Sequence, residues 1–416
     1  MDETETETEI EIEIEIPQFF LCPISLQIMR DPVTAISGIT YDRQSIEQWL
    51  STSKNTICPV TKQPLSKDSD LTPNHTLRRL IQAWSSENSS SGIDRIPTPK
   101  PCLDKFYLIK LIKDLRNPNL QSKILVELEF FAAENERNRK YMVEAGVPRA
   151  LLLFIVSCFN NNRITGLQEA VSILRLIRVP TKESKVLLVE NDQIIPALTW
   201  VLGCNLDNNN NNVSVKSHAV SVLKTVLEDS SSCVLERLNP EFFDKVIDLL
   251  RQNNITQQGI NAALKVLLNA CPWGRNRVMM VESGAVFELI ELEWRSRENK
   301  TTELILGVLY NLCSCADGRA EFLSHKGGIA VVAKRILTVS PTADDRAILI
   351  LSLISKHSGT SMVLQEMLNV KAVSKLCMIL QADCATYLKE KARDIIKSHS
   401  DELKNHPCFD VSHLIR

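Results

Sequence analysis

Two cysteines near the N-terminus are of a type that could bind a metal ion or act as a nucleophile. Cys22 and Cys58 lie 36 positions apart, and each is followed by a proline. A structural zinc ion requires a full tetrahedral set of ligands. Between residues 17 and 90, only Cys22, Cys58 and His75 offer sulfur or nitrogen ligands. The ligand count therefore excludes a pair of zinc sites, and the sequence predicts neither a metal nor another cofactor.

A second hypothesis is that one of these cysteines is a nucleophile that forms a thioester. Such a thiol needs a lowered pKa and usually a neighbouring base. No histidine is close in sequence to Cys22 or Cys58. The pattern favours small buried residues beneath two loops, with covalent catalysis as the minor alternative, and no catalytic residue is predicted.

The elements around these cysteines follow from short-range signals. Ser37-Gly38 separates β-prone runs at 33–36 and 39–41 and predicts a hairpin turn. Asp42 is a candidate cap for a helix that extends to about Leu50. Thr72 and Pro73 are expected as the N-cap and first residue of a second helix. Its apolar side is expected to carry Leu77, Leu80, Ile81 and Trp84.

Composition limits the protein class. The 416 residues are 44% hydrophobic and 5% aromatic, with a net charge of −2. Residues 1–16 contain eight acids and no base, so the remainder carries a net charge of +6. This charge is too small and too dispersed to indicate nucleic-acid binding. The ten-residue apolar run at 150–159 is shorter than the roughly 20 residues of a membrane span. Twelve scattered cysteines favour reduced thiols in an intracellular protein.

Changes in composition divide the chain into four segments. Residues 1–16 are expected to be an acidic disordered tail, because their charge density opposes compaction. Residues 17–90 form a first folded unit, and residues 91–101 form a linker with prolines at 97, 99 and 101. Residues 102–416 are expected to fold as a helical array.

The array repeats a phrase of polar or small residues between two apolar helices. Taken at Gly146, Asn191, Asn239, Gly284 and Gly327, the phrase recurs in steps of 45, 48, 45 and 43 residues. That period in helical sequence fits armadillo or HEAT repeats. Each repeat buries its apolar faces against its neighbours, so an elongated solenoid with an extended groove is expected.

Both regions resemble one plant family. The first unit carries Pro17, Phe20, Cys22-Pro23-Ile24, Met29, Asp31-Pro32-Val33, Ser37-Gly38, Tyr41-Asp42-Arg43, Trp49 and Cys58-Pro59 in order. This order resembles the U-box, the zinc-free relative of the RING domain, and the Glu-Ala-Gly and Glu-Ser-Gly phrases look like armadillo repeats. The expected fold class is mainly α: a small α+β U-box module followed by a right-handed α-solenoid of armadillo repeats.

The resemblance implies an E3 ubiquitin-protein ligase without a covalent ligase intermediate. It implies a binding platform for a ubiquitin-charged conjugating enzyme made by Ile24, Trp49 and Pro59, with Lys62 as a candidate clamp. Many relatives have arginine at the clamp position, and lysine lacks its planar fork of donors. Structural roles are implied for Cys22, Pro23, Asp31, Pro32, Val33, Gly38, Tyr41, Asp42, Arg43 and Cys58.

The resemblance also suggests partners and a setting. A protein substrate is expected in the solenoid groove, in plant stress or defence signalling, in the cytoplasm and with nuclear presence left open. Homo-oligomers also stay open, whereas nucleic acid and a membrane span are not expected. Two alternatives are a non-catalytic armadillo adaptor whose U-box-like module serves dimerisation, and a nucleic-acid or transport-receptor solenoid. The array's tryptophans, at 200, 273 and 294, do not recur at the repeat period that the last alternative would require.

Overall fold

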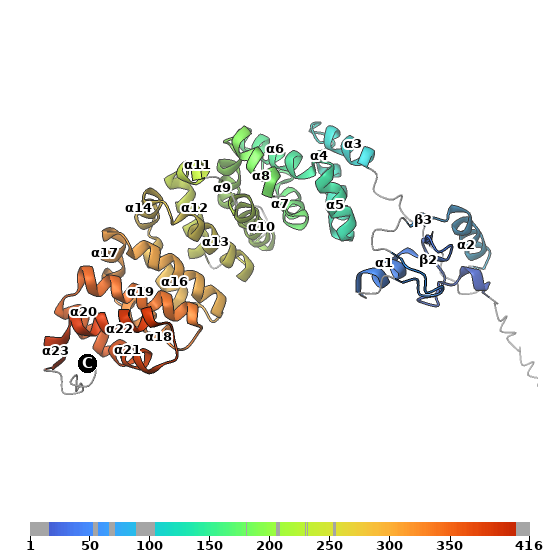
Figure 1. Cartoon of the computed structure of the whole chain (residues 1–416). Helices are drawn as coiled ribbons and strands as arrows, with labels where there is room; N and C mark the ends of the chain where they lie inside the picture. Colours follow the sequence, from blue (N-terminus) through green and yellow to red (C-terminus); the bar gives the residue numbers. More distant parts are fainter. Residues whose placement is uncertain are drawn as a thin grey trace, which may run out of the picture. The chain divides into compact units, whose positions relative to one another are not determined.

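A computed structural model describes residues 16–52, 57–65, 71–88, 105–179, 181–204, 209–228, 230, 232–252 and 255–404. The chain divides into two compact units, residues 1–102 and 103–416 (Figure 1). The predicted acidic tail, apart from Ile16, and the predicted linker lie outside the described residues. The four-segment division stays a prediction.

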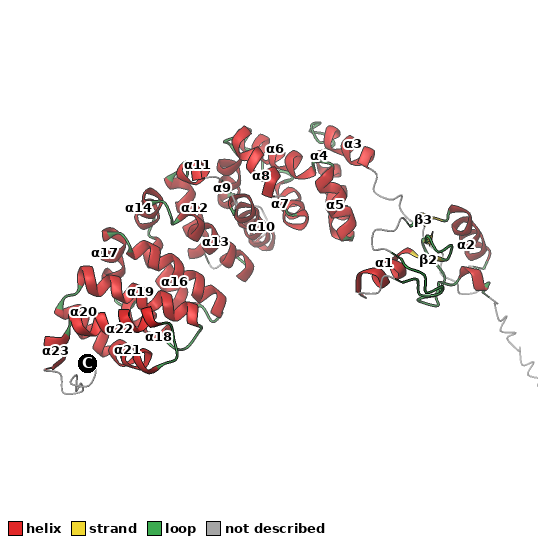
Figure 2. Ribbon diagram, in the orientation of Figure 1, coloured by secondary structure: helices red, strands yellow, loops and turns green. Residues whose placement is uncertain are grey.

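The first unit is a small α+β module (Figure 2). It contains the 3-10 helix η1 (Gln18–Phe20), strands β1 (Pro32–Thr34), β2 (Thr40–Asp42) and β3 (Thr72–Pro73), and helices α1 (Arg43–Thr52) and α2 (His75–Glu87). The antiparallel sheet has the order β2-β1-β3, with Val33 opposite Tyr41 on one side and Pro73 on the other. The predicted hairpin is confirmed, and Gly38 at its turn has φ +78°, a conformation that favours glycine.

The predicted starts of both helices need correction. The Asp42 carboxylate accepts hydrogen bonds from the backbone N–H groups of Arg30 and Asp31, 2.8 and 2.9 Å away, and so fastens a loop rather than capping α1. Thr72 and Pro73 form β3 instead of starting a helix. Asn74 is the N-cap of α2 and accepts from the Leu77 N–H. Thr72 pairs with Thr34 of β1 in the sheet. Asn74, another residue type that caps helices well, follows two positions later and takes the cap.

The second unit consists of helices throughout its described residues. They are α3 (Lys105–Asp114), α4 (Gln121–Glu134), α5 (Glu136–Glu144), α6 (Val147–Asn160), α7 (Leu167–Ile177), α8 (Thr181–Glu190), α9 (Ile194–Gly203), α10 (Asn209–Leu227), α11 (Ser232–Glu236), α12 (Pro240–Arg251), α13 (Gln257–Ala270), α14 (Gly274–Glu282), α15 (Ala285–Arg295), α16 (Asn299–Cys313), α17 (Ala316–Ser324), α18 (Gly328–Arg335), α19 (Pro341–Ser358), α20 (Ser361–Asn369), α21 (Ala372–Gln381), α22 (Thr386–Ser398) and α23 (Ser400–Lys404).

These helices stack in two rows. Helices α4, α7, α10, α13, α16, α19 and α22 pack against one another in sequence order and form the inner row. Helices α6, α9, α12, α15, α18 and α21 form the outer row, and shorter helices connect the two. In Figure 1 the second unit curves, and α7, α10, α13 and α16 lie on the inner side of its arc. This is the predicted solenoid, so the fold class is confirmed.

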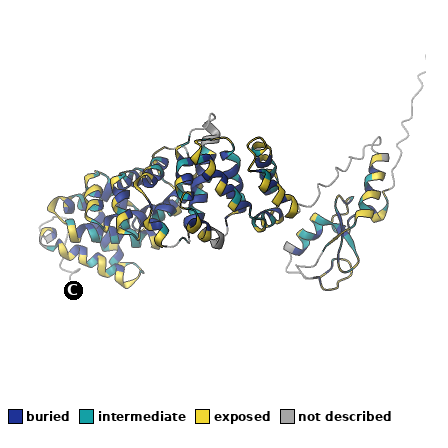
Figure 3. Cartoon of the chain, turned by 90° about the horizontal axis from the view of Figure 1, so that it is seen from above, coloured by how far each residue is buried: buried dark blue, intermediate teal, exposed yellow. Residues whose placement is uncertain are grey.

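A continuous apolar core runs between the rows. Figure 3 shows buried residues in the interior and exposed ones on the outer faces of the helices. Leu80 of the first unit is an exception to the predicted pattern, because it is 52% exposed while neighbouring Ile81 is buried. No single helix among the described residues is long and apolar enough to cross a membrane, although the bent pair α5 and α6 passes by length and composition together.

The repeated phrase turns the chain in several ways. Gly146 and Gly284 adopt the left-handed conformation, with φ +83° and +81°, which is common for a glycine that follows the end of a helix. Asn239 differs, because its φ is −104° and its side chain caps the start of α12. Gly327 has φ −105°. The phrase recurs in each repeat, but the backbone conformation at its glycine or asparagine differs from one repeat to another.

Candidate functional site

Two loops of the first unit share one backbone plan. In the first, the Cys22 N–H donates to the Gln27 carbonyl and the Leu26 N–H donates to the Cys22 carbonyl. In the second, the same pair of bonds links Cys58 to Gln63 and Lys62 to Cys58. Leu26 and Lys62 occupy matching positions with φ +56° and +61°. The loops are therefore local structural repeats, and each displays the residues that follow its Cys-Pro pair.

The cysteine sulfurs hold these loops by accepting hydrogen bonds. Cys22 Sγ lies 3.3 Å from the Asp42 nitrogen, and Cys58 Sγ lies 3.3 Å from the Thr61 nitrogen and 3.0 Å from the Tyr41 hydroxyl. Both cysteines are fully buried. Because neither sulfur is accessible, the arrangement favours a structural role over covalent catalysis.

The same hydrogen bonds set the acidity of the two thiols. Burial raises the pKa of Cys22, but backbone N–H donors from Ser25, Asp42 and Ile24 outweigh it and lower that pKa below its usual value. Burial likewise opposes ionisation of Cys58, yet donors from Ser37, Thr61 and Tyr41 lower its pKa to about 6. Burial and Cys58 raise the pKa of Tyr41, so its hydroxyl remains a donor.

Asp31, which directly precedes β1, forms ion pairs with two arginines. Arg43 Nε lies 2.6 Å from Asp31 Oδ2, and Arg78 of α2 reaches Asp31 Oδ1 at 3.6 Å. The Arg43 backbone N–H also donates to the Asp31 carbonyl. Asp31 therefore joins the loop before β1 to both helices of the module. The contribution of Arg78 was not predicted from the sequence.

The predicted platform residues lie on three elements of the module: Ile24 on the first loop, Trp49 on α1 and Pro59 on the second loop. Ile24, Trp49 and Pro59 are each half-buried and so present part of their apolar surface. The Trp49 indole N–H donates to the Ile57 carbonyl at 3.2 Å, which joins α1 to the second loop just before Cys58. Pro23 is exposed, whereas Pro32, Val33 and Tyr41 lie in the interior.

Two exposed residues of this region were not predicted. Leu26 is 75% exposed in the first loop and Val60 is 48% exposed in the second. The sequence marks them only by their position in the shared loop plan. Leu26 corresponds to Lys62, and Val60 corresponds to Ile24. Each lies on the same loop as a predicted platform residue, Leu26 with Ile24 and Val60 with Pro59.

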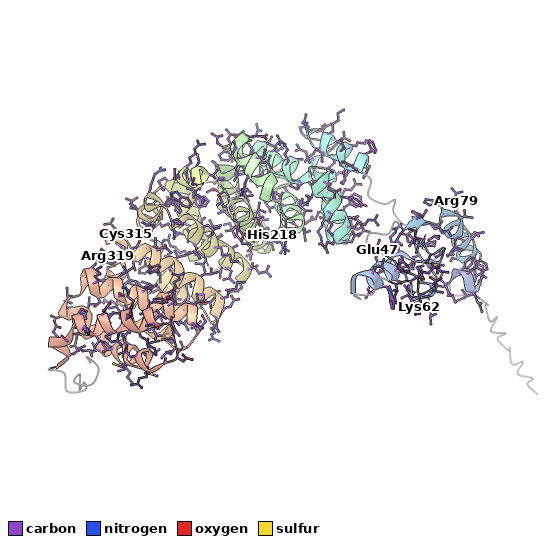
Figure 4. All side chains as sticks on the ribbon, in the orientation of Figure 1. Glu47, Lys62, Arg79, His218, Cys315 and Arg319 are labelled. Carbon is purple, nitrogen blue, oxygen red and sulfur yellow. The ribbon has the colours of Figure 1, made fainter. Side chains whose placement is uncertain are left out.

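Lys62 lies at the surface of the module (Figure 4). Its Nζ donates to the Pro59 carbonyl at 2.9 Å. The ammonium group therefore folds back over its own loop in this conformation. A clamp role would require Lys62 to exchange this bond for a contact with a partner.

Arginines at one position in three repeats form a second group that sequence reasoning missed. Arg277 donates to the carbonyls of Cys271 and Pro272, and Arg319 donates to those of Cys313 and Ser314. Arg139 reaches the Ala132 carbonyl in the same way. Figure 4 places Arg319 beside Cys315, next to the end of α16. These guanidinium groups satisfy carbonyls at the ends of inner-row helices.

Metal binding is not indicated by these contacts. Within the parts of the chain that the structure describes, no group of three or more histidine, cysteine, aspartate or glutamate residues could hold an ion. Cys22 and Cys58 instead accept hydrogen bonds from the protein.

Comparison with protein families covers both units. Residues 16–90 match the U-box domain, and residues 108–416 match the plant U-box protein ARM repeat region. The second match spans more than half of the chain.

This chain belongs to the plant U-box family. Similar curated proteins of Arabidopsis thaliana include E3 ubiquitin-protein ligase PUB24, 45% identical with 96% of each chain covered, and E3 ubiquitin-protein ligase PUB23, 42% identical with 95% of each covered. Among solved structures, an engineered protein of the Northeast Structural Genomics Consortium aligns with a TM-score of 0.52 at 16% identity, over 75% of this chain and 76% of that one. That likeness concerns the solenoid fold alone. The family predicted from sequence is confirmed.

Proposed function

We propose that this plant U-box protein is an E3 ubiquitin ligase that recruits a ubiquitin-charged conjugating enzyme through its two loops. The observation that carries the proposal is the half-buried set Ile24, Trp49 and Pro59, held by matched loops and by the Trp49 bond to Ile57. A few residues carry most of the binding energy of a protein interface, and tryptophan is among the commonest of them. Two similar Arabidopsis thaliana proteins that are named E3 ubiquitin-protein ligases support the assignment.

The proposed reaction is direct aminolysis. A substrate lysine amine attacks the thioester carbonyl between ubiquitin and the conjugating enzyme. An isopeptide bond forms, the carbon–sulfur bond breaks, and the enzyme's cysteine leaves as a thiolate. The U-box contributes proximity and orientation, which is consistent with the buried sulfurs of Cys22 and Cys58. Lys62 is proposed to leave the Pro59 carbonyl and help to hold the two partners together.

The solenoid is proposed to select the protein substrate along its rows of helices. An extended concave surface of stacked repeats suits recognition of a long segment. A setting in plant stress or defence signalling, in the cytoplasm and with nuclear presence left open, remains part of the proposal.

The test is discharge of ubiquitin from a single charged conjugating enzyme to free lysine. We predict that Trp49→Ala in the full chain lowers the discharge rate at least tenfold, because loss of a hot-spot aromatic costs about 2 kcal/mol or more of binding. Leu80→Ala is the matched control, since Leu80 is 52% exposed on α2 of the same module.

Thermal unfolding of the same variants separates contact from folding. Trp49 also packs against the core of the module, so a lowered midpoint would indicate a core role. A folded Trp49→Ala variant with normal discharge would exclude the platform.

A further inference from the structure

A cavity of about 130 Å³ opens between the second and third repeats of the solenoid. Its walls come from four places: the end of α6, the α8–α9 junction, α9 itself, and α11 with the start of α12. Its floor and sides are largely apolar and include Phe159, Leu188, Ile195, Trp200, Leu238 and Phe242. Phe159 and Trp200 pack with ring centroids 5.8 Å apart.

The cavity coincides with an irregular repeat. α11 has five residues, whereas α5, α8, α14, α17 and α20, helices at the same place in other repeats, have nine or ten each. The described helix α11 is therefore about one turn shorter than its counterparts. Val234 of this short helix and Leu238 just after it line the cavity. The degenerate third copy of the sequence repeat thus creates a local site.

The size of the cavity limits what it can hold. A dry cavity of about 150 Å³ can hold one benzene ring, whereas small-molecule sites are usually about 300–1,000 Å³. The observed 130 Å³ therefore fits one ring or one branched aliphatic group. That is the size of a single side chain supplied by a larger partner.

The rim provides groups that suit a peptide backbone. The side-chain carbonyls of Asn191 and Asn239 accept from the N–H groups of Gln193 and Phe242. This orientation leaves each amide NH₂ group as a donor for a partner carbonyl. Asp192, Arg237 and Glu241 are exposed around the same rim, so the surroundings of the apolar cavity are polar and carry two acids against one base.

We propose that this cavity binds one bulky apolar side chain, aromatic or leucine, from an extended peptide segment of a protein partner. The excess of acid at the rim favours a lysine or arginine beside that side chain. The site is built by the α8–α9 junction, α11 and the outer-row helices α9 and α12, and is separate from the inner row. The inference deepens the proposed function by naming a recognition element of the substrate, and it rests on that function.

Selection of a linear peptide library on the full-length protein tests the inference. The expected peptides share one aromatic or leucine position with a basic neighbour. Alanine at the shared position should weaken binding of a fluorescent synthetic peptide at least tenfold, because burial of such a side chain contributes that much or more. Failure to enrich any peptide, or enrichment without a shared apolar position, would overturn the proposal.

Cavity-filling variants locate the binding. Val234→Phe enlarges a half-buried lining residue of α11, and Ile195→Phe fills the cavity from α9. Each should weaken the peptide at least tenfold with little change in the midpoint of thermal unfolding. Cys233→Phe is the matched control, because Cys233 is exposed on the same helix and does not line the cavity. Its affinity should stay within twofold of wild type.

Contrary outcomes are distinct. Undiminished peptide binding by both filled variants, with loss on Lys265→Glu in α13, would place recognition on the inner row and reject the cavity. Binding of free indole as tightly as the selected peptide would reject a protein partner, because the rim would then contribute nothing. In the absence of peptide, the full-length cavity variants should discharge ubiquitin to lysine at the wild-type rate. Absence of discharge in every form, wild type included, would count against the ligase function rather than against the cavity.

Discussion

Among the described residues of the U-box module, eleven buried apolar residues form its core cluster, whereas the solenoid draws buried apolar residues from every helix between α3 and α23 into one continuous cluster. Small domains bury a smaller share of their surface and have little stability to spare. The module compensates with polar contacts: Asp31 with two arginines, Asp42 with two backbone N–H groups, and donors to both cysteines.

Polar contacts in the solenoid are of two kinds. Some recur from repeat to repeat, and others lie between a few neighbouring helices. Arg277 and Arg319 perform the same capping in neighbouring repeats. Glu293 is fully buried, lies 2.5 Å from Arg335 and accepts from the Thr302 hydroxyl. The comparison indicates that loss of one polar contact lowers the stability of the whole module, whereas loss of one in the solenoid lowers stability only locally.

Separating the units gives the largest expected effect. A fragment of residues 1–102 should retain lysine discharge, because every proposed platform residue lies within it. A fragment of residues 103–416 should show none. Discharge assays with one charged conjugating enzyme measure both. A folded but inert first fragment would mean that the solenoid contributes directly to catalysis, and the division between the units would fail.

Removal of one ion-paired acid from each unit tests how widely a single contact contributes to the stability of that unit. Glu293→Ala should cost about 3–5 kcal/mol, because it leaves Arg335 without its buried partner. Asp31→Ala should cost about 1–3 kcal/mol, since its carboxylate is partly exposed. Denaturant unfolding of the two fragments measures these changes.

The smaller loss should have the broader consequence. Asp31→Ala is expected to lower the midpoint of the whole module and its discharge activity, whereas Glu293→Ala should loosen the region around α15, α16 and α18 first. Asp31→Asn and Glu293→Gln are the matched controls, and each should recover part of the loss. Cooperative unfolding of the entire solenoid by Glu293→Ala would contradict the comparison.

Lys62→Arg addresses the surface of the module rather than its interior. Arginine provides a planar fork of donors for two partners at once, so discharge should rise severalfold. Lys62→Gln should lower it by a similar factor, and both variants should unfold at the wild-type midpoint. Equal rates for all three residues at this position would exclude the clamp.

Acid should destabilise the two units in different pH windows. Donors to Cys58 lower its pKa to about 6 from an ordinary 9.0, so the unfolded state binds more protons between these values. Stability of the module from this source is complete above pH 9 and is lost as pH falls towards 6. Burial and Arg175 lower the pKa of His218 to about 4 from 6.5, so the solenoid loses its share as pH falls from 6.5 to 4.

Thermal midpoints of the two fragments between pH 4 and 9 measure both windows. Cys58→Ser should flatten the curve of the module, and His218→Gln should flatten that of the solenoid. His218 lies on α10 (Figure 4). A module whose midpoint does not change between pH 6 and 9 would show that the Cys58 hydrogen bonds do not favour the thiolate.

The sequence by itself determined the family, the hairpin at Gly38 and the helical repeat period, because these depend on local residue order and spacing. The tertiary structure decided which residues meet. Asp31 pairs with Arg43 and with Arg78, 12 and 47 positions away, and no local pattern fixes such partners. It also decided that Thr72 joins β1 and leaves the helix cap to Asn74, since both residues cap well and only the nearby strand distinguishes them. The cavity beneath α11 required the packing of three repeats.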